Sequence, residues 1–193
     1  MRIERSFFER DTLTVARELI GQTLTAVSPE GPVRGVIVET EAYLGYRDDA
    51  AHTYKGRTAR TGPLFGPKGH AYVYLIYGMY CCLNISAGLE DEPDCVLIRA
   101  LRPAEGLDIM AGRRRTERAE VLCSGPGKLC MAMGIGREDS GADLCSENGR
   151  IYLEYGDRPE RVAATPRIGI DYAEKCRGEL WRFIEEGSLW VSR

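Results

Sequence analysis

The chain of 193 residues is 44% hydrophobic and 28% charged. This length and composition are typical of one globular domain with a substantial core, and they exclude a disordered or low-complexity protein. No segment approaches the roughly 20 apolar residues of a membrane span, so we expect a cytoplasmic protein without membrane contact. The formal net charge of −3 is unfavourable for binding nucleic acid, unless cations gather locally.

The chain has seven cysteines, an odd number, and no C-x-x-C pair. This usage is typical of a reducing compartment, where cysteine serves as a small hydrophobic residue. Neither histidine has a cysteine at the spacing of a tetrahedral zinc site, so we expect no structural zinc.

The first elements are predicted to be a helix and two strands. Residues 10–21 have an apolar stripe at helical spacing, with Asp11 or Thr12 as the N-cap. The period then changes, which predicts strands over 23–28 and 33–44, joined by the turn sequence "PEGP".

A long loop and a hairpin follow. The loop from residue 45 to 69 is rich in Gly, Thr, Arg and Pro. It is longer than compact domains usually tolerate, so we expect it to be functional. Two strand-like runs between residues 70 and 88, hinged at Gly78, predict a β-hairpin, and residues 94–103 predict another buried strand.

The second half adds two helices and more strands. A helix is expected over 103–115 with Pro103 in its first turn, and another within 123–136, capped by Ser124. Further strands are expected at residues 149–155 and 166–170, and within 179–192 with "EEGS" as a turn. Together these elements predict an α+β fold: a single domain over residues 1–193, built on a curved, mainly antiparallel sheet with flanking helices and a protruding β-hairpin.

One predicted strand carries a carboxylate and an aromatic ring on the same face. Side chains alternate along a strand, so Glu39, Glu41 and Tyr43 share a face at the end of an apolar run. A carboxylate that leaves the core on such a strand is partly desolvated, which suits a general base. An edge strand with two solvated glutamates and a packing tyrosine is an equally good interpretation of this stretch alone.

Tyrosines are concentrated in the predicted hairpin, at Tyr72, Tyr74, Tyr77 and Tyr80. Such tyrosines usually pack across strands, but Tyr77 stands at the turn, where little of its own sheet can cover it. The segment from residue 56 to 70, before the hairpin, has no acid, and its lysine and arginine residues are Arg57, Arg60 and Lys68. An aromatic wedge beside a cationic loop is what insertion into a base stack requires, and aromatic faces near a carboxylate could sandwich an extruded base.

Longer motifs indicate a family. Five of them stand in order along the chain: "VETEAYLGYRDDAAH", "YVYLIYGMYCCLN", "VLIRAL", "CSGPGKLC" and "GSLWVS". In this order they closely resemble the 3-methyladenine DNA glycosylases of the alkyladenine DNA glycosylase family. The opening "FFERDTLTVARELIGQTL" resembles the family's first helix, so the likeness covers nearly the whole chain. It implies a monofunctional enzyme of base excision repair that hydrolyses the N-glycosidic bond of flipped alkylated or deaminated purines, with 3-methyladenine and hypoxanthine as candidates.

The resemblance also implies roles for single residues. Glu41 matches the glutamate that deprotonates the attacking water, and Arg99 matches a residue beside that water. Tyr43 and Tyr74 match the aromatic residues that stack on the two faces of the flipped base. His52 matches a group that contacts the base edge through its main chain.

Two further matches lie in the hairpin and set its register. Asn84 matches a pocket residue that discriminates against the amino group of guanine, and Tyr77 matches the residue inserted through the minor groove. A two-residue hairpin loop would put Tyr74 and Asn84 on opposite faces of the sheet. A three-residue loop from Tyr77 to Met79 puts them on one face, so we predict the three-residue loop.

The implied partner is double-stranded DNA containing damaged purines, bound by a monomer. Candidates for contact with the DNA backbone are Arg57, Arg60, Lys68 and Lys128. No lysine falls near Glu41 in the motifs, so we expect attack by water and not a Schiff base, and neither a metal nor another cofactor. Because the net charge is acidic, we expect few phosphate contacts and a shallow salt dependence.

Other interpretations stay open. A non-catalytic module for distorted DNA would keep the Tyr77 wedge but would not need Glu41. "CSGPGKL" could bind a phosphate at a helix N-terminus or be a plain helix cap, and it is a weak sign of a helix-hairpin-helix glycosylase. A metal-dependent hydrolase lacks any HExxH-like spacing here; its ligands would be Glu39, Glu41, Asp48, Asp49 and His52.

Overall fold

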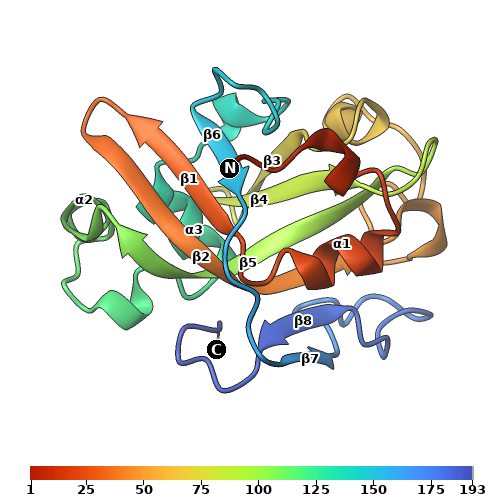
Figure 1. The fold of residues 1–193 in the computed structure, drawn as a ribbon. Coiled ribbons are helices and arrows are strands. Elements are labelled where there is room, and N and C mark those ends of the chain that lie inside the picture. The colour runs from red at the N-terminus through yellow and green to blue at the C-terminus, as the bar shows by residue number, and fades with distance from the viewer. Residues whose placement is uncertain (193) are drawn as a thin grey trace.

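The computed structural model describes residues 1–192, which form an antiparallel sheet of eight strands with three helices packed around it (Figure 1). The helices are α1 (Thr12–Glu18), α2 (Leu107–Arg114) and α3 (Pro126–Met133). The strands are β1 (Thr23–Ser28), β2 (Gly31–Tyr43), β3 (Ala71–Ile76), β4 (Tyr80–Ala87), β5 (Asp94–Glu105), β6 (Ile151–Glu154), β7 (Val162–Thr165) and β8 (Arg182–Glu185). The predicted α+β class with a curved antiparallel sheet is confirmed.

Strand β2 is the centre of the sheet. The strands follow the order β3-β4-β5-β2-β1-β6, and β8 pairs with both β2 and β7. One side of β2 is covered by β1 along residues 31–36 and by β8 along residues 39–41, while β5 lies along the other side. Glu39 and Glu41 are therefore interior to the sheet and fully buried, so the edge-strand interpretation is wrong.

Helix α1 covers the part of the sheet that carries the two glutamates, on the viewer's side in Figure 1. Asp11 caps the helix by accepting a hydrogen bond from the Thr14 N–H at 2.8 Å, as predicted. Val15 and Ala16 are buried beneath it. The Thr40 hydroxyl donates to the Ala16 carbonyl at 2.8 Å, which fixes the helix over the end of β2.

The predicted hairpin register is confirmed. Ile76 pairs with Tyr80 and Tyr72 pairs with Asn84, so the loop has three residues, Tyr77 to Met79. Tyr74 pairs with Cys82, two positions from Asn84, and the two side chains therefore lie on the same face of the sheet.

Two predicted helix starts are wrong. Strand β5 continues through Pro103 to Glu105, and α2 begins only at Leu107. Pro103 lies opposite Gly35 beside a bulge at Ala104 of β5 itself, and a bulge tolerates a residue without an N–H. Ser124 does not cap α3: its backbone pairs with Ala100, and the glycine after it occupies the N-cap position. The side chains predicted to face inward from α3 are buried, at Leu129, Cys130 and Met133.

The C-terminal third also departs from the prediction. Residues 166–170 form no strand; the Arg167 side chain binds Asp48 and the Ile168 main-chain N–H binds Glu41. Of the strands expected within 179–192, the structure has β8, and no strand follows the "EEGS" turn up to residue 192. The sequence does not predict β7, the partner of β8. Strand β6 lies within the predicted range of 149–155. None of the helices within residues 1–192 is long and apolar enough to cross a bilayer.

Candidate active site

A cavity of about 800 Å³ lies where the end of β2 meets the β3–β4 hairpin and the start of α3. Of the residues that the sequence singles out, those in its wall are Tyr43, His52, Arg60, Tyr74, Tyr77, Asn84, Arg99 and Lys128. Helix α3 can approach the hairpin closely because residue 127 is glycine, where a Cβ would lie 2.9 Å from that of Tyr80. The fold thus gathers residues from distant parts of the chain around one opening.

Glu41 lies directly behind the cavity wall. Its Oε1 accepts a hydrogen bond from the Ile168 N–H at 2.7 Å. Its Oε2 accepts from the Tyr43 hydroxyl at 2.9 Å and from Arg99 Nη1 at 3.2 Å. Tyr43, Arg99 and Ile168 all line the cavity, so the partners of both carboxylate oxygens belong to its wall. Glu41 itself is fully buried.

The second carboxylate of β2 has a different environment. Glu39 accepts hydrogen bonds from Arg99 Nε at 2.9 Å and from Arg182 Nε at 2.7 Å. It also accepts from the main-chain N–H and the hydroxyl of Ser192, at 2.5 and 2.8 Å. Burial alone would lower the pKa of Arg99, but the charges of Glu41 and Glu39 raise it above its ordinary value. Glu39 therefore positions Arg99 and does not face the cavity as a second acid or base.

Aromatic rings form two walls of the cavity. The rings of His52 and Tyr74 are 4.6 Å apart and nearly perpendicular, and Tyr72 lies behind them with its hydroxyl 2.9 Å from His52 Nδ1. Burial raises the pKa of Tyr43 and of Tyr74, and it raises that of Tyr72 to about 12, so all three stay neutral. Desolvation and the charge of Arg60 lower the pKa of His52 to about 4. Apart from Arg60, this part of the wall is uncharged at neutral pH.

Asn84 lies at the buried end of the cavity, with 3% of its surface exposed. Its Nδ2 donates to the Tyr72 carbonyl at 3.2 Å, and its Oδ1 lies 3.8 Å from Cys95 Sγ. The amide is thereby fixed in one orientation, which suits a group that distinguishes one base edge from another.

The hairpin tip is exposed and strained. Tyr77 is 84% exposed and Met79 is 68% exposed. Tyr77 has a φ of +52°, in the left-handed region that a residue with a Cβ adopts at a cost of about 1–2 kcal/mol. Such strain concentrates at functional positions.

The candidate DNA-backbone contacts differ in their placement. Arg57, Arg60 and Lys128 are exposed, and the last two also line the cavity. Lys68 is 7% exposed, and its ammonium group donates to the carbonyl of Glu92. This burial counts against a contact between Lys68 and DNA.

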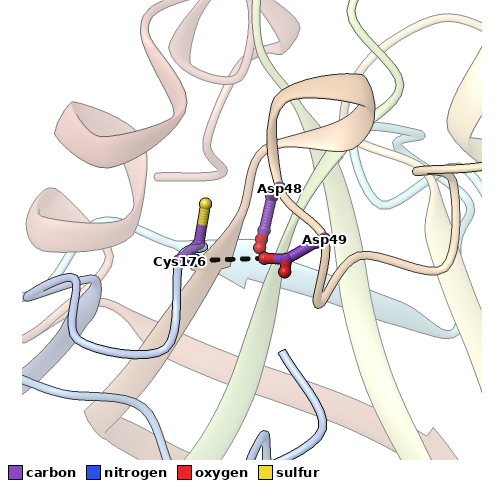
Figure 2. A group of neighbouring side chains, drawn as sticks. All are labelled: Asp48, Asp49 and Cys176. Atoms are coloured by element: carbon purple, nitrogen blue, oxygen red, sulfur yellow. Dashed lines mark hydrogen bonds between the residues drawn. The ribbon is translucent and has the colours of Figure 1, made fainter. Parts of the chain in front are cut away.

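The acidic residues suggested as metal ligands are engaged by the protein itself. Within residues 1–192, one group of three has ligand atoms close together: Asp48, Asp49 and Cys176 (Figure 2). Asp48 binds Arg167 through both carboxylate oxygens, at 2.5 and 2.9 Å. Hydrogen bonds from main-chain N–H groups, that of Lys175 foremost, lower the pKa of Asp49 to about 2. Each carboxylate already has protein donors, and the metal-hydrolase set suggested by the sequence does not converge on one point.

Sequence reasoning missed the contribution of the C-terminal third. The Arg167 side chain binds Asp48, and the Ile168 main-chain N–H donates to Glu41. Ser192 binds Glu39. The only signal was that the terminal "GSLWVS" belongs to the family-like motifs. Nothing in the composition of this motif indicates that Ser192 contacts a buried carboxylate.

Comparisons with known proteins identify the family of the chain. The sequence profile of the methylpurine-DNA glycosylase family matches residues 6–189. A relative from Methanocella arvoryzae, provisionally named a 3-methyladenine DNA glycosylase, is 48% identical over 99% of this chain and 96% of its own length. Relatives with the same provisional name from Clostridium tetani and Clostridium acetobutylicum are 43% and 44% identical, each over 100% of this chain and over 100% and 98% of their own lengths.

Proposed function

Because the chain belongs to the methylpurine-DNA glycosylase family, we propose that it releases 3-methyladenine and related purines, including hypoxanthine, from double-stranded DNA by hydrolysing their N-glycosidic bonds. The observation that carries this proposal is that Arg99 lines an aromatic-walled cavity and binds Glu41 directly behind the wall. The volume of about 800 Å³ has room for an extruded purine nucleotide.

The flipped base stacks between Tyr43 and Tyr74. Both rings line the cavity and both are neutral, so each can present a π-face to a purine. Asn84 reads the edge of the base that enters deepest, and the main chain at His52 contacts another edge. A cationic alkylated base binds more tightly than a neutral one between aromatic faces, because the faces of the rings attract positive charge.

Bond cleavage requires stabilisation of positive charge on the sugar. As the C1′–N bond breaks, the base takes the bonding electrons and the deoxyribose becomes oxocarbenium-like. The buried Glu41 carboxylate stabilises that charge and accepts a proton from the attacking water, whose oxygen bonds to C1′. Arg99 orients Glu41 and the water. Lys128 lines the cavity at the start of α3, with its ammonium group 3.4 Å from the Ser124 hydroxyl. Because water and not a lysine is the nucleophile in this proposal, no Schiff base forms and the enzyme is monofunctional.

Tyr77 enters the duplex from the hairpin tip and fills the space that the base leaves. Its exposure and its strained backbone are those of a wedge and not of a packing residue. Arg57, Arg60 and Lys128 contact the DNA backbone around the opening.

The experiment is single-turnover release of base from duplex DNA containing 3-methyladenine or hypoxanthine, with EDTA present. We expect release by the wild type and loss of at least a hundredfold in rate for Glu41→Gln, with DNA binding retained. Glu154→Gln is the matched control, because this partly buried glutamate binds Arg34 in β2, away from the cavity wall. Binding without release by the wild type would instead favour a recognition module.

A further inference from the structure

A buried cation lies behind one wall of the cavity. The guanidinium of Arg167 is fully buried, 4.6 Å from the centre of the Tyr43 ring and 4.9 Å from that of Trp181. Tyr43 lines the cavity and Arg167 does not. The tyrosine ring therefore separates the space where a base would stack from a permanent positive charge.

Asp48 compensates that charge. It is fully buried and binds both Nη atoms of Arg167. Main-chain N–H groups of Leu44 and Ala50 donate to it at 3.2 and 3.0 Å, so its carboxylate is fixed behind the loop that leaves β2. Arg167 Nη1 also donates to the Ala42 carbonyl at 3.0 Å, which fixes the guanidinium against the end of the strand.

We propose that the Asp48–Arg167 pair sets the preference of this site between positively charged and neutral bases. The proposal rests on the proposed function, in particular on stacking of the base against Tyr43. A cation behind the ring and a cationic base in front of it share one π-system and repel each other, whereas a neutral base is almost indifferent to that charge. The carboxylate of Asp48 reduces the repulsion without occupying the cavity.

Removing one charge of the pair at a time should shift the preference in opposite directions. Asp48→Asn leaves the Arg167 cation uncompensated, which disfavours a cationic base. Arg167→Gln removes the cation and favours a cationic base. For charges roughly 8–10 Å apart at an effective dielectric constant of about 20, each shift is on the order of tenfold.

The test compares single-turnover release of 3-methyladenine, which is cationic in DNA, with release of hypoxanthine, which is neutral, from the same duplex. The measured quantity is the ratio of the two rates. We expect the ratio to fall about tenfold for Asp48→Asn and to rise for Arg167→Gln. Arg167→Lys retains the positive charge and should stay within about threefold of the wild-type ratio.

A second ion pair, in which the carboxylate is buried and the arginine is exposed, provides the control. Asp139 is 6% exposed and binds Arg150, yet neither residue lines the cavity. Asp139→Asn should lower the stability of the protein and leave the ratio unchanged, which separates a general loss of stability from a change of preference. If Asp48→Asn does not fold, the two arginine variants test the proposal. A ratio of release rates that rises for Arg167→Gln but not for Arg167→Lys supports it, and equal ratios for the two variants overturn it.

Failure of the proposed function and failure of the inference about the Asp48–Arg167 pair give different results. A wild type that releases neither base contradicts the proposed function. A wild type that releases both bases, with ratios that stay constant or move in the same direction for Asp48→Asn and Arg167→Gln, overturns the inference alone.

Discussion

Glu39 should contribute more to stability than any surface carboxylate, although it faces no substrate. It is fully buried and accepts hydrogen bonds from Arg99 and Arg182, whose side chains are 10% and 13% exposed. Ser192 donates two more. Replacing Glu39 with Gln keeps the shape but removes the charge, and it turns an amide N–H toward groups that are themselves donors.

Breaking a buried ion pair on one side costs about 3–5 kcal/mol, because the partner charge stays buried without compensation. In Glu39→Gln, Arg99 keeps its ion pair with Glu41, but Arg182 loses its ion pair with Glu39. We therefore expect the free energy of unfolding to fall by about 3–5 kcal/mol. A domain of this size has about 5–15 kcal/mol of stability in total, so the variant remains folded at room temperature. At about 2–4 °C per kcal/mol, we expect Tm to fall by roughly 10 °C.

The assay is urea unfolding of the wild type, Glu39→Gln and Glu105→Gln, followed by tryptophan fluorescence. Glu105 pairs with Arg34 at 3.5 Å with about half of its side chain exposed, so its substitution should cost less than about 1 kcal/mol. An equally small loss for Glu39→Gln at unchanged slope would refute the idea that Glu39 compensates two buried cations.

Three further results are expected. His52 is neutral when folded above about pH 4 but charged when unfolded below its ordinary pKa of 6.5, so it reduces stability as pH falls through that window; the urea midpoint should fall less from pH 7 to pH 5 in His52→Gln. Tyr77→Gly should raise stability by about 0.5 kcal/mol, because relief of the left-handed strain exceeds the added chain entropy, while slowing base release at least tenfold. If Arg57, Arg60 and Lys128 are the main phosphate contacts, the logarithm of DNA affinity should fall with the logarithm of salt with a slope of about −3, and a much steeper slope would contradict that set.

Much of the fold could be predicted where local chemistry decides the structure. The Asp11 cap, the alternation along β2 and the hairpin register all depend on residues within a few positions of one another. The helix prediction at Pro103 is wrong because a favourable place for proline in a helix does not reveal a bulge in its own strand. Strand β7 could not be predicted because it is only four residues long and none of them is buried, so the alternation of a strand gives too weak a signal.

The candidate site divides in the same way. Glu41, Tyr43 and the hairpin tyrosines have a sequence signal, since their residue types are unusual for their positions. Arg167 and Ser192 have none, because their importance depends on tertiary contacts with Asp48 and Glu39. The burial of Lys68 likewise could not be inferred from a run of cations that looks uniformly exposed.

The hydrogen bonds that join the two sides of the site have a kinetic consequence. Glu41 and Ile168 are 127 positions apart, Asp48 and Arg167 are 119 apart, and Glu39 and Ser192 are 153 apart. Closing such long loops is entropically costly and slow, whereas a hairpin with a three-residue turn forms in about 1–10 μs. During refolding, we therefore expect the β3–β4 hairpin to be complete long before the carboxylate and its arginine are fixed, and enzymatic activity to return with the slowest phase.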